Sequence, residues 1–295
     1  SEAIEARPPP PLSLPAAVET LRRVLTDRMR RCLSPRTADV CEAVLFGRPT
    51  LPAALREDLA RTGALHVVAV SGSHLSLVLA GLRIFTARLR FLIPTLVLYA
   101  ALTGFSPPVV RSLVLAVGAC LGRRAGGRQP PFGALAFSAC VVLSAEPSAL
   151  FDAGFLLSFS AFFGLLSATP ANALIDPLGR TASGFKARVV ESLKASAIAT
   201  LMTAPVGVAY FRQAPWLGPL ATLALAPAIP LLLALSALAA ALPEIAAPGV
   251  AAEIVVAYAS GVARLFAAVP GASLSIPKPF DWTIAAAAGA ATFFC

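Results

Sequence analysis

The sequence predicts an all-α fold: a polytopic transmembrane helical bundle with broken helices, preceded by amphipathic helices. Of the 295 residues, 57% are hydrophobic and only 13% are charged, whereas soluble globular chains have about 45–50% apolar and about 25% charged residues. Long apolar runs fill most of the chain after residue 62, and prolines interrupt several of them. This composition excludes a single soluble core, a disordered tail and a disulfide scaffold.

The charged residues divide the chain into a polar beginning and an apolar remainder. Residues 1–62 hold 18 of the 39 charged side chains (24 basic and 15 acidic), and the other 233 residues hold 21. The apolar remainder has 14 basic and 7 acidic residues, and the whole chain has a net charge of +9. A basic excess suits anionic lipid headgroups, and it equally suits a polyanionic substrate such as nucleic acid.

The polar beginning is expected to consist of a linker and an amphipathic helical lead-in. Residues 1–15 contain four consecutive prolines, which fix φ and lack a backbone donor, so they are expected to be an extended linker. Residues 16–62 are the lead-in, and its first helix, residues 16–34, has apolar side chains on one face and arginines on the other. Two further helices are each followed by a glycine suited to a left-handed C-cap: residues 37–46 before Gly47, and 52–61 before Gly63.

Residues 63–295 are expected to form the transmembrane domain. A helix needs about 20 apolar residues to cross a hydrocarbon core of ~30 Å. Apolar runs lie at residues 64–84, 91–105, 107–121, 132–150, 151–169, 189–211, 215–242, 248–269 and 283–295. The last run covers only about 20 Å, so we expect a truncated final helix. Pro94, Pro205 and, within 215–242, Pro219, Pro227 and Pro230 predict broken helices, whose freed backbone is tolerated in a membrane only when buried in protein or lining a watery cavity.

A first polar cluster interrupts the first of these runs. It contains His66, Ser71, Gly72 and His74. In a continuous helix Ser71 and His74 would share a face, and Gly72 favours a break there. The histidines can be neutral hydrogen-bonding partners or cationic contacts to phosphate. A serine beside a histidine also suggests an intramembrane serine hydrolase, although the chain lacks the full GxSxG elbow at this place, and structural hydrogen bonding between helices is the simpler alternative.

A second polar cluster extends from Gly104 to Ser112. Ser106 followed by Pro107 is a favourable helix start, with serine as the N-cap and proline in the first turn. This start places Arg111 about one turn inside the next helix. The arginine either extends to the membrane interface or points into the bundle.

A third polar cluster begins at Asp152, which is expected to cap a helix or neutralise a group near a membrane face. Ser158 follows and can form a hydrogen bond to another helix. An aromatic stripe at helical spacing accompanies it: Phe155, Phe159, Phe162 and Phe163. Such a stripe serves packing or lipid contact, and in a nucleic-acid channel it would offer stacking surfaces for bases. Lys194 is a further unusual cation, because it lies within the apolar run 189–211.

No catalytic residue, metal site or cofactor is predicted. The chain has two histidines and five cysteines, and neither HExxH nor CxxC motifs are present. We therefore expect the cysteines to be small core residues.

The three clusters, in this order, resemble the competence domain of the ComEC family, the inner-membrane proteins of bacterial natural transformation. The resemblance rests on residues 63–74 (GALHVVAVSGSH), 104–112 (GFSPPVVRS) and 152–161 (DAGFLLSFSA), and it extends over about residues 20–290. It implies a multi-pass protein of the bacterial inner membrane that passes one strand of incoming DNA. The nuclease-like metallo-β-lactamase domain of many relatives is not in this chain, so we expect no enzyme.

The resemblance also implies the partners and the path. Single-stranded DNA and the lipid bilayer are the expected partners, together with other DNA-uptake proteins and further copies of the chain. The proposed path needs groups that attract the negative phosphates but bind them weakly enough for the strand to move on. The expected pore-lining residues are His66, Ser71, Gly72, His74, Gly104, Arg111, Asp152, Phe155, Ser158 and Lys194. A small-solute transporter, besides the serine hydrolase, is the alternative function.

Overall fold

The computed structural model describes residues 14–68, 70, 72–86, 88–124, 131–168, 185–272 and 274–275. Within this part of the chain the regular structure is helical apart from two strands of two residues each. The predicted all-α bundle is thereby confirmed. Residues 1–13 of the expected linker and the apolar run 283–295 lie outside the described residues, and the first helix already begins at Leu14.

The lead-in forms three helices close to their predicted positions. They are α1 (Leu14–Arg30), α2 (Pro35–Phe46) and α3 (Ala53–Arg61). The expected glycine ends are confirmed, because Gly47 and Gly63 have φ angles of 70° and 71°. The Gly47 N–H donates to the carbonyl of Ala43, which satisfies one of the free carbonyls at the end of α2.

The remaining helices follow the predicted apolar runs. They are α4 (Leu65–Val68), α5 (Gly72–Phe85), α6 (Leu89–Leu102), α7 (Pro107–Arg124), α8 (Pro131–Ala145), the 3-10 helix η1 (Pro147–Phe151), α9 (Ala153–Ala168), α10 (Phe185–Phe211), α11 (Gly218–Leu225), α12 (Ala228–Ala241) and α13 (Ala246–Ala267). Strands β1 (Gln213–Ala214) and β2 (Leu274–Ser275) pair antiparallel.

Two helices of the described chain are long and apolar enough to cross a membrane, residues Val189–Phe211 of α10 and the whole of α13. The pair α11 and α12, bent by 41°, makes a third if it is counted as one span. Helices α5 to α9 are apolar over only 10–17 residues, and at 1.5 Å per residue even 17 residues extend about 26 Å. The predicted runs that lie within the described residues are thus helical, and five of their helices are shorter than a full span.

Helix breaks occur at two of the predicted places. The first apolar run divides between α4 and α5, beside Gly72, and the run 215–242 divides between α11 and α12, where Pro227 is the N-cap of α12. Proline ends a helix because it lacks an N–H and its ring crowds the preceding turn. Pro94 and Pro205, by contrast, lie inside the continuous helices α6 and α10.

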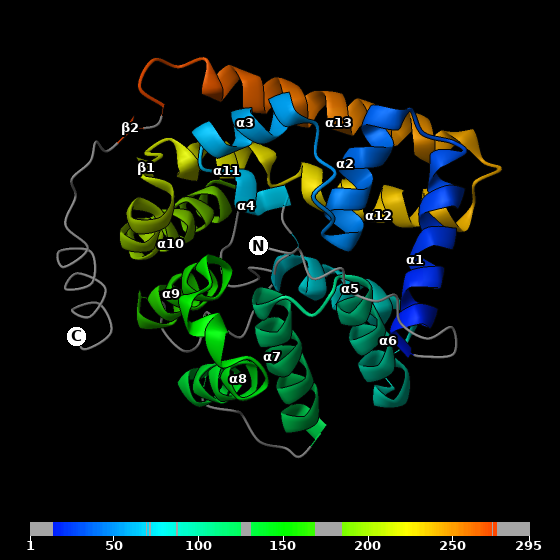
Figure 1. Ribbon diagram of the computed structural model, residues 1–295, viewed down its shortest axis with the longest axis horizontal. Helices are drawn as coiled ribbons and strands as arrows, with labels where there is room; N and C mark the ends of the chain where they lie inside the picture. Colours follow the sequence, from blue (N-terminus) through cyan, green and yellow to red (C-terminus); the bar gives the residue numbers. More distant parts are fainter. Residues whose placement is uncertain are drawn as a thin grey trace, which may run out of the picture.

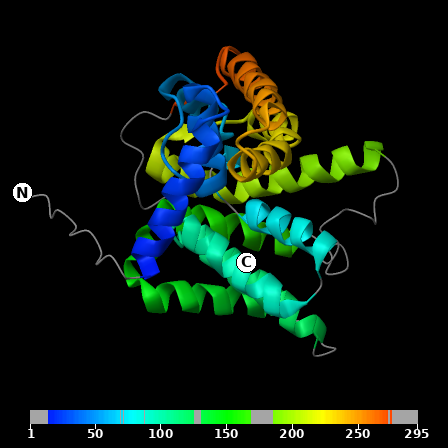
Figure 2. The ribbon, with the colours of Figure 1, turned by 90° about the vertical axis from the view of Figure 1, so that its right-hand side faces the viewer.

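The helices pack in two layers, which Figure 1 and Figure 2 show from two directions. One layer holds α2, α3, α11, α12 and α13, with α13 packed along α3 and α12. The other holds α5 to α9, in which α7 contacts α5, α6, α8 and α9. Helix α10 lies between the layers and contacts both α9 and α11. Helix α7 is therefore positioned to bring distant parts of the chain together.

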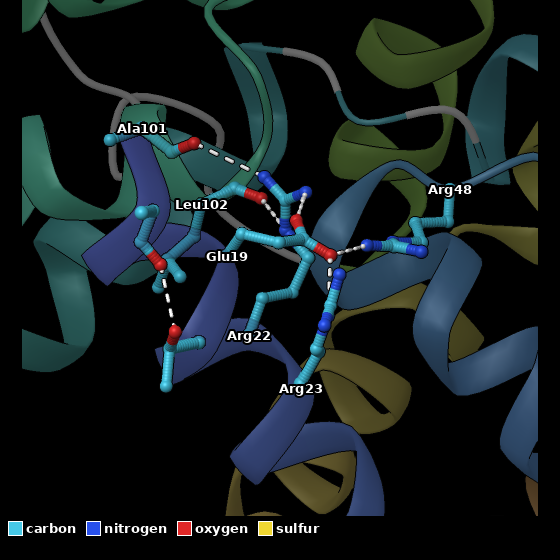
Figure 3. Close-up of polar contacts among 8 residues, drawn as sticks. Glu19, Arg22, Arg23, Arg48, Ala101 and Leu102 are labelled. Carbon is cyan, nitrogen blue, oxygen red and sulfur yellow. Dashed lines mark hydrogen bonds and ion pairs between the residues drawn. The ribbon is translucent and has the colours of Figure 1, made fainter. Parts of the chain in front are cut away.

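Helix α1 joins the two layers through arginines at the ends of two other helices. Arg28 donates from Nε to the carbonyl of Ala240 at 2.8 Å and from Nη2 to that of Ala241 at 2.7 Å, at the end of α12. Arg22 donates to the carbonyls of Leu102 and Ala101 at the end of α6 (Figure 3). The last carbonyls of a helix lack partners within it, and cations are favourable there.

Glu19 holds Arg22 in place and also pairs with two other arginines (Figure 3). Its carboxylate lies 2.7 Å from Arg22, 2.6 Å from Arg48 and 3.4 Å from Arg23. Burial alone would raise the pKa of Glu19, but the hydrogen bond and charge of Arg48, together with the other two arginines, outweigh burial and lower this pKa. The carboxylate therefore stays charged at neutral pH, and its stabilising effect is lost only as the pH falls through that lowered pKa.

Removing the Arg28 guanidinium is expected to loosen α1 from α12. Arg28→Gln deletes both hydrogen bonds to helix-end carbonyls, so we expect the free energy of unfolding to fall by about 1–2 kcal/mol. Titration of SDS into mixed micelles of the purified chain measures this free energy. Arg23→Gln is the matched control, because the Arg23 side chain is 75% exposed and its loss should change the value by less than about 0.5 kcal/mol. Equal effects of the two variants would contradict the role of Arg28.

Candidate functional site

The first polar cluster lies where α4 ends and α5 begins. Because the chain breaks there, its two histidines have different surroundings. His66, on α4, is exposed, and its Nδ1 lies 2.8 Å from the carbonyl oxygen of Gly63. His74, in the first turn of α5, is fully buried. Ser71 lies outside the described residues.

Gly72 brings the start of α5 against α7, and a larger residue here would have to displace side chains of α7. A Cβ atom at Gly72 would lie 2.5 Å from Ser112 Oγ and 3.3 Å from Arg111 Nη2. The Ser112 hydroxyl, which donates to the carbonyl of Pro108 at 2.8 Å, cannot easily move away. The first polar cluster is therefore in contact with the second.

Arg111 points into the bundle, which decides between the two orientations that the sequence allowed. Helix α7 begins at Pro107, as predicted, and Arg111 follows one turn later with 8% of its surface exposed. Its Nε donates to Ser158 Oγ of α9 at 3.0 Å, and its guanidinium carbon lies 4.7 Å from the ring centre of Phe162. The ring of Phe159 is 5.9 Å away. The second cluster is thus joined to the third.

The third cluster has the expected cap and cross-helix hydrogen bond. Asp152 follows η1, and its Oδ1 accepts a hydrogen bond from the N–H of Phe155 at 2.9 Å, which caps the start of α9. The rings of Phe155 and Phe159 stack at 4.3 Å, and both are buried. The cap fixes where α9 begins, and it therefore fixes the position from which Ser158 reaches Arg111.

These contacts define a site that we call the Arg111 cluster. It consists of Gly72, Arg111, Ser112, Ser158, Phe159 and Phe162. Three of these residues, Gly72, Arg111 and Ser158, were predicted as site residues. Ser112, Phe159 and Phe162 were not, although the helical spacing of the phenylalanines was a signal that at least one ring would share a face with Ser158.

Other predicted site residues are not among the contacts of the Arg111 cluster. Gly104 has a φ of 83° in the turn between α6 and α7, and no atom lies within 4 Å of where its Cβ would be. Lys194 is 63% exposed on α10 and forms an ion pair with Glu191 at 3.2 Å. Its position within an apolar run suggested an interior cation, but glutamate one turn earlier on the same helix provides its partner at the surface.

Arg111 differs from the other ionisable groups of the described bundle in its partners. Arg111 is the only arginine among the described residues that is buried. It takes part in none of the ion pairs between those residues. Glu42, also buried, is paired with Arg30 at 2.7 Å. The positive charge of Arg111 is therefore met by one hydroxyl and two aromatic faces. Cation–π contacts of this kind stabilise a guanidinium without neutralising its charge.

The described residues contain no group of three histidine, cysteine, aspartate or glutamate side chains that could hold a metal ion. Four cysteines lie among them as free thiols, and burial raises the pKa of Cys41 to about 11, which keeps that thiol protonated. The chemistry that the Arg111 cluster can offer is therefore charge, hydrogen bonds and aromatic surface.

Fold and site together define a helical membrane-type protein with a buried, basic cluster at a helix break. The chain belongs to the Competence protein family, whose model matches residues 45–295. It is also similar to ComE operon protein 3 of Bacillus subtilis (strain 168), with 29% identity over 158 residues, which cover 50% of this chain and 20% of that protein. The matched part thus spans about a fifth of this relative's length. No solved structure matches the chain.

Proposed function

We propose that this chain forms a path for single-stranded DNA across the bacterial inner membrane, as a multi-pass protein of natural transformation. Membership of the Competence protein family supports a role in DNA uptake rather than catalysis. The observation that carries the proposal is the meeting of three polar clusters, distant in the sequence, around Arg111. Polar and charged groups inside an apolar bundle are costly, and in membrane proteins they mark substrate paths.

The surroundings of Arg111 suit a passing polyanion. The residues that line a conducting path must attract the substrate and also release it. Arg111 offers a full positive charge, while Ser158 and the ring of Phe162 compete with an incoming phosphate for the same guanidinium. The break between α4 and α5 directs the start of α5, the positive end of its helix dipole, at this position. Because these groups would contact the phosphate, which every nucleotide carries, the arrangement does not distinguish one nucleotide from another.

A transport assay with the purified chain tests the proposal. Vesicles that contain the chain should protect externally added, labelled single-stranded DNA from nuclease, and protein-free vesicles should not. Ser158→Leu should reduce protection to the protein-free level, because a leucine would remove the hydrogen bond to Arg111 and crowd its guanidinium. Ser167→Leu is the matched control on the same helix, since Ser167 is exposed and donates only to its own helix at Phe163.

The outcomes separate the candidate functions. Protection no greater than in protein-free vesicles would overturn the DNA path. Uptake of small anions without DNA would favour the small-solute transporter. Labelling of Ser71 by a serine-directed probe, with no DNA protection, would favour the serine hydrolase.

A further inference from the structure

We propose that Arg111 is the binding site for a single phosphodiester group of the strand, so that the chain recognises the DNA backbone rather than its bases. This inference rests on the proposed function and assigns its ligand chemistry. The guanidinium is 8% exposed, and no described residue supplies a carboxylate to it. A buried charge without a counter-charge is costly, and that cost is relieved when an anion binds.

The terminal nitrogens of the guanidinium are the groups that would meet an anion. Nε is occupied by Ser158 Oγ at 3.0 Å, and the faces of the guanidinium lie near Phe159 and Phe162. Within the part of the chain that the structure describes, the hydrogen bonds of Arg111 involve neither of its terminal nitrogens, and Nη2 lies beside Gly72, the first residue of α5. Two terminal N–H groups on one planar fork suit two oxygens of one phosphate, which a lysine ammonium cannot match.

The start of α5 adds a second source of positive potential at the same point. Helix α5 has 14 residues and begins at Gly72, so the N–H groups of its first turn have no partner within the helix. Because Gly72 has no side chain, backbone and Nη2 approach each other closely. A helix start and a buried arginine that converge both favour a negative charge.

A phosphate site of this kind reads no bases. Phosphate contacts position a nucleic acid without reporting its sequence. The aromatic rings nearest to Arg111 are engaged with its guanidinium or, in the case of Phe155 and Phe159, with each other. The expected specificity is therefore for backbone charge.

Binding of two 12-nucleotide strands that differ only in the backbone tests the site. One strand has natural phosphodiester linkages, and the other has uncharged methylphosphonate linkages. Fluorescence anisotropy with the purified chain in detergent gives the two affinities, and their ratio is the phosphodiester preference. Arg111→Gln should lower this preference by about 10-fold to 100-fold. The charge-matched control is Arg264→Gln, which should leave most of the preference intact because Arg264 is exposed on α13.

A second variant makes the test independent of whether Arg111→Gln folds. Phe162→Trp places a fluorescent ring beside the guanidinium, at the position where 4.7 Å now separates ring centre and guanidinium carbon. After subtraction of the wild-type emission, the natural strand should change the tryptophan signal and the methylphosphonate strand should not. Equal responses to both strands would overturn the phosphate site.

The remaining outcomes separate this inference from the proposed function. If the wild-type chain binds natural single strands and Arg111→Gln keeps the full phosphodiester preference, the phosphate site is wrong and the DNA path stands. If Arg111→Gln lowers the affinity for both strands equally, Arg111 only holds α7 against α9, and the phosphate site is again wrong. If the wild-type chain binds neither strand, the proposed function itself fails.

Discussion

Gly63→Ala is expected to lower the free energy of unfolding by about 2–4 kcal/mol. Gly63 ends α3 with a φ of 71°, a left-handed conformation that strains any residue with a Cβ. A Cβ here would also lie well inside 3.0 Å of the Pro215 ring, which the chain between β1 and α11 holds in place. Both costs act at the turn that leads into α4. SDS titration in mixed micelles measures the loss.

Gly271→Ala separates the two costs at Gly63. Gly271 has nearly the same φ, 72°, but no atom lies within 4 Å of where its Cβ would be. This control should therefore show the conformational strain alone, about 1–2 kcal/mol. If both substitutions cost the same, Pro215 does not restrict Gly63, and the turn after α3 packs against Pro215 more loosely than the structure indicates.

Gly249→Ala is expected to cost about 3 kcal/mol, because it pushes α13 away from the lead-in. A Cβ at Gly249, in the first turn of α13, would lie well inside 3.0 Å of the carbonyl oxygen of Cys32. That oxygen belongs to the backbone between α1 and α2, so it cannot turn aside as a side-chain end would. Helix α13 must then shift as a body, and its contacts with α2 and α3 should loosen.

Gly261→Ala is the matched control in the same helix. No atom lies within 4 Å of the Cβ position at Gly261. Because alanine favours a helix more than glycine does, this variant should be neutral or gain up to about 1 kcal/mol. If Gly261→Ala lowered the free energy of unfolding as much as Gly249→Ala, the loss would come from replacing any glycine of α13. It would then not come from the close approach of Gly249 to the Cys32 carbonyl.

The helices could be predicted from the sequence because their signals are local. The amphipathic pattern of α1, the left-handed glycines after α2 and α3, and the proline at the start of α7 each depend on residues within one or two turns. The cap of α9 by Asp152 is local in the same way. Length was harder to predict, since hydropathy does not show where a polar turn ends an apolar helix.

The candidate site could be predicted only in part. Arg111 and Ser158 were recognised because polar groups within apolar runs are unusual, and Gly72 because a glycine between two serines favours a helix break. Lys194 met the same criterion, yet its charge is satisfied at the surface by Glu191. Phe162 looked like one ring of a packing stripe, and nothing in the spacing of the stripe showed that it would lie 4.7 Å from the guanidinium.

The sequence by itself determined the class of this protein: its apolar helices, their breaks and the amphipathic lead-in follow from composition and local pattern. The tertiary structure decided which polar residues meet. Arg111 and Ser158 are 47 residues apart and lie on different helices, and Arg22 and Arg28 of α1 reach the ends of α6 and α12. Such contacts depend on how all the helices pack, because each helix can turn several faces to its neighbours and only the common packing selects one.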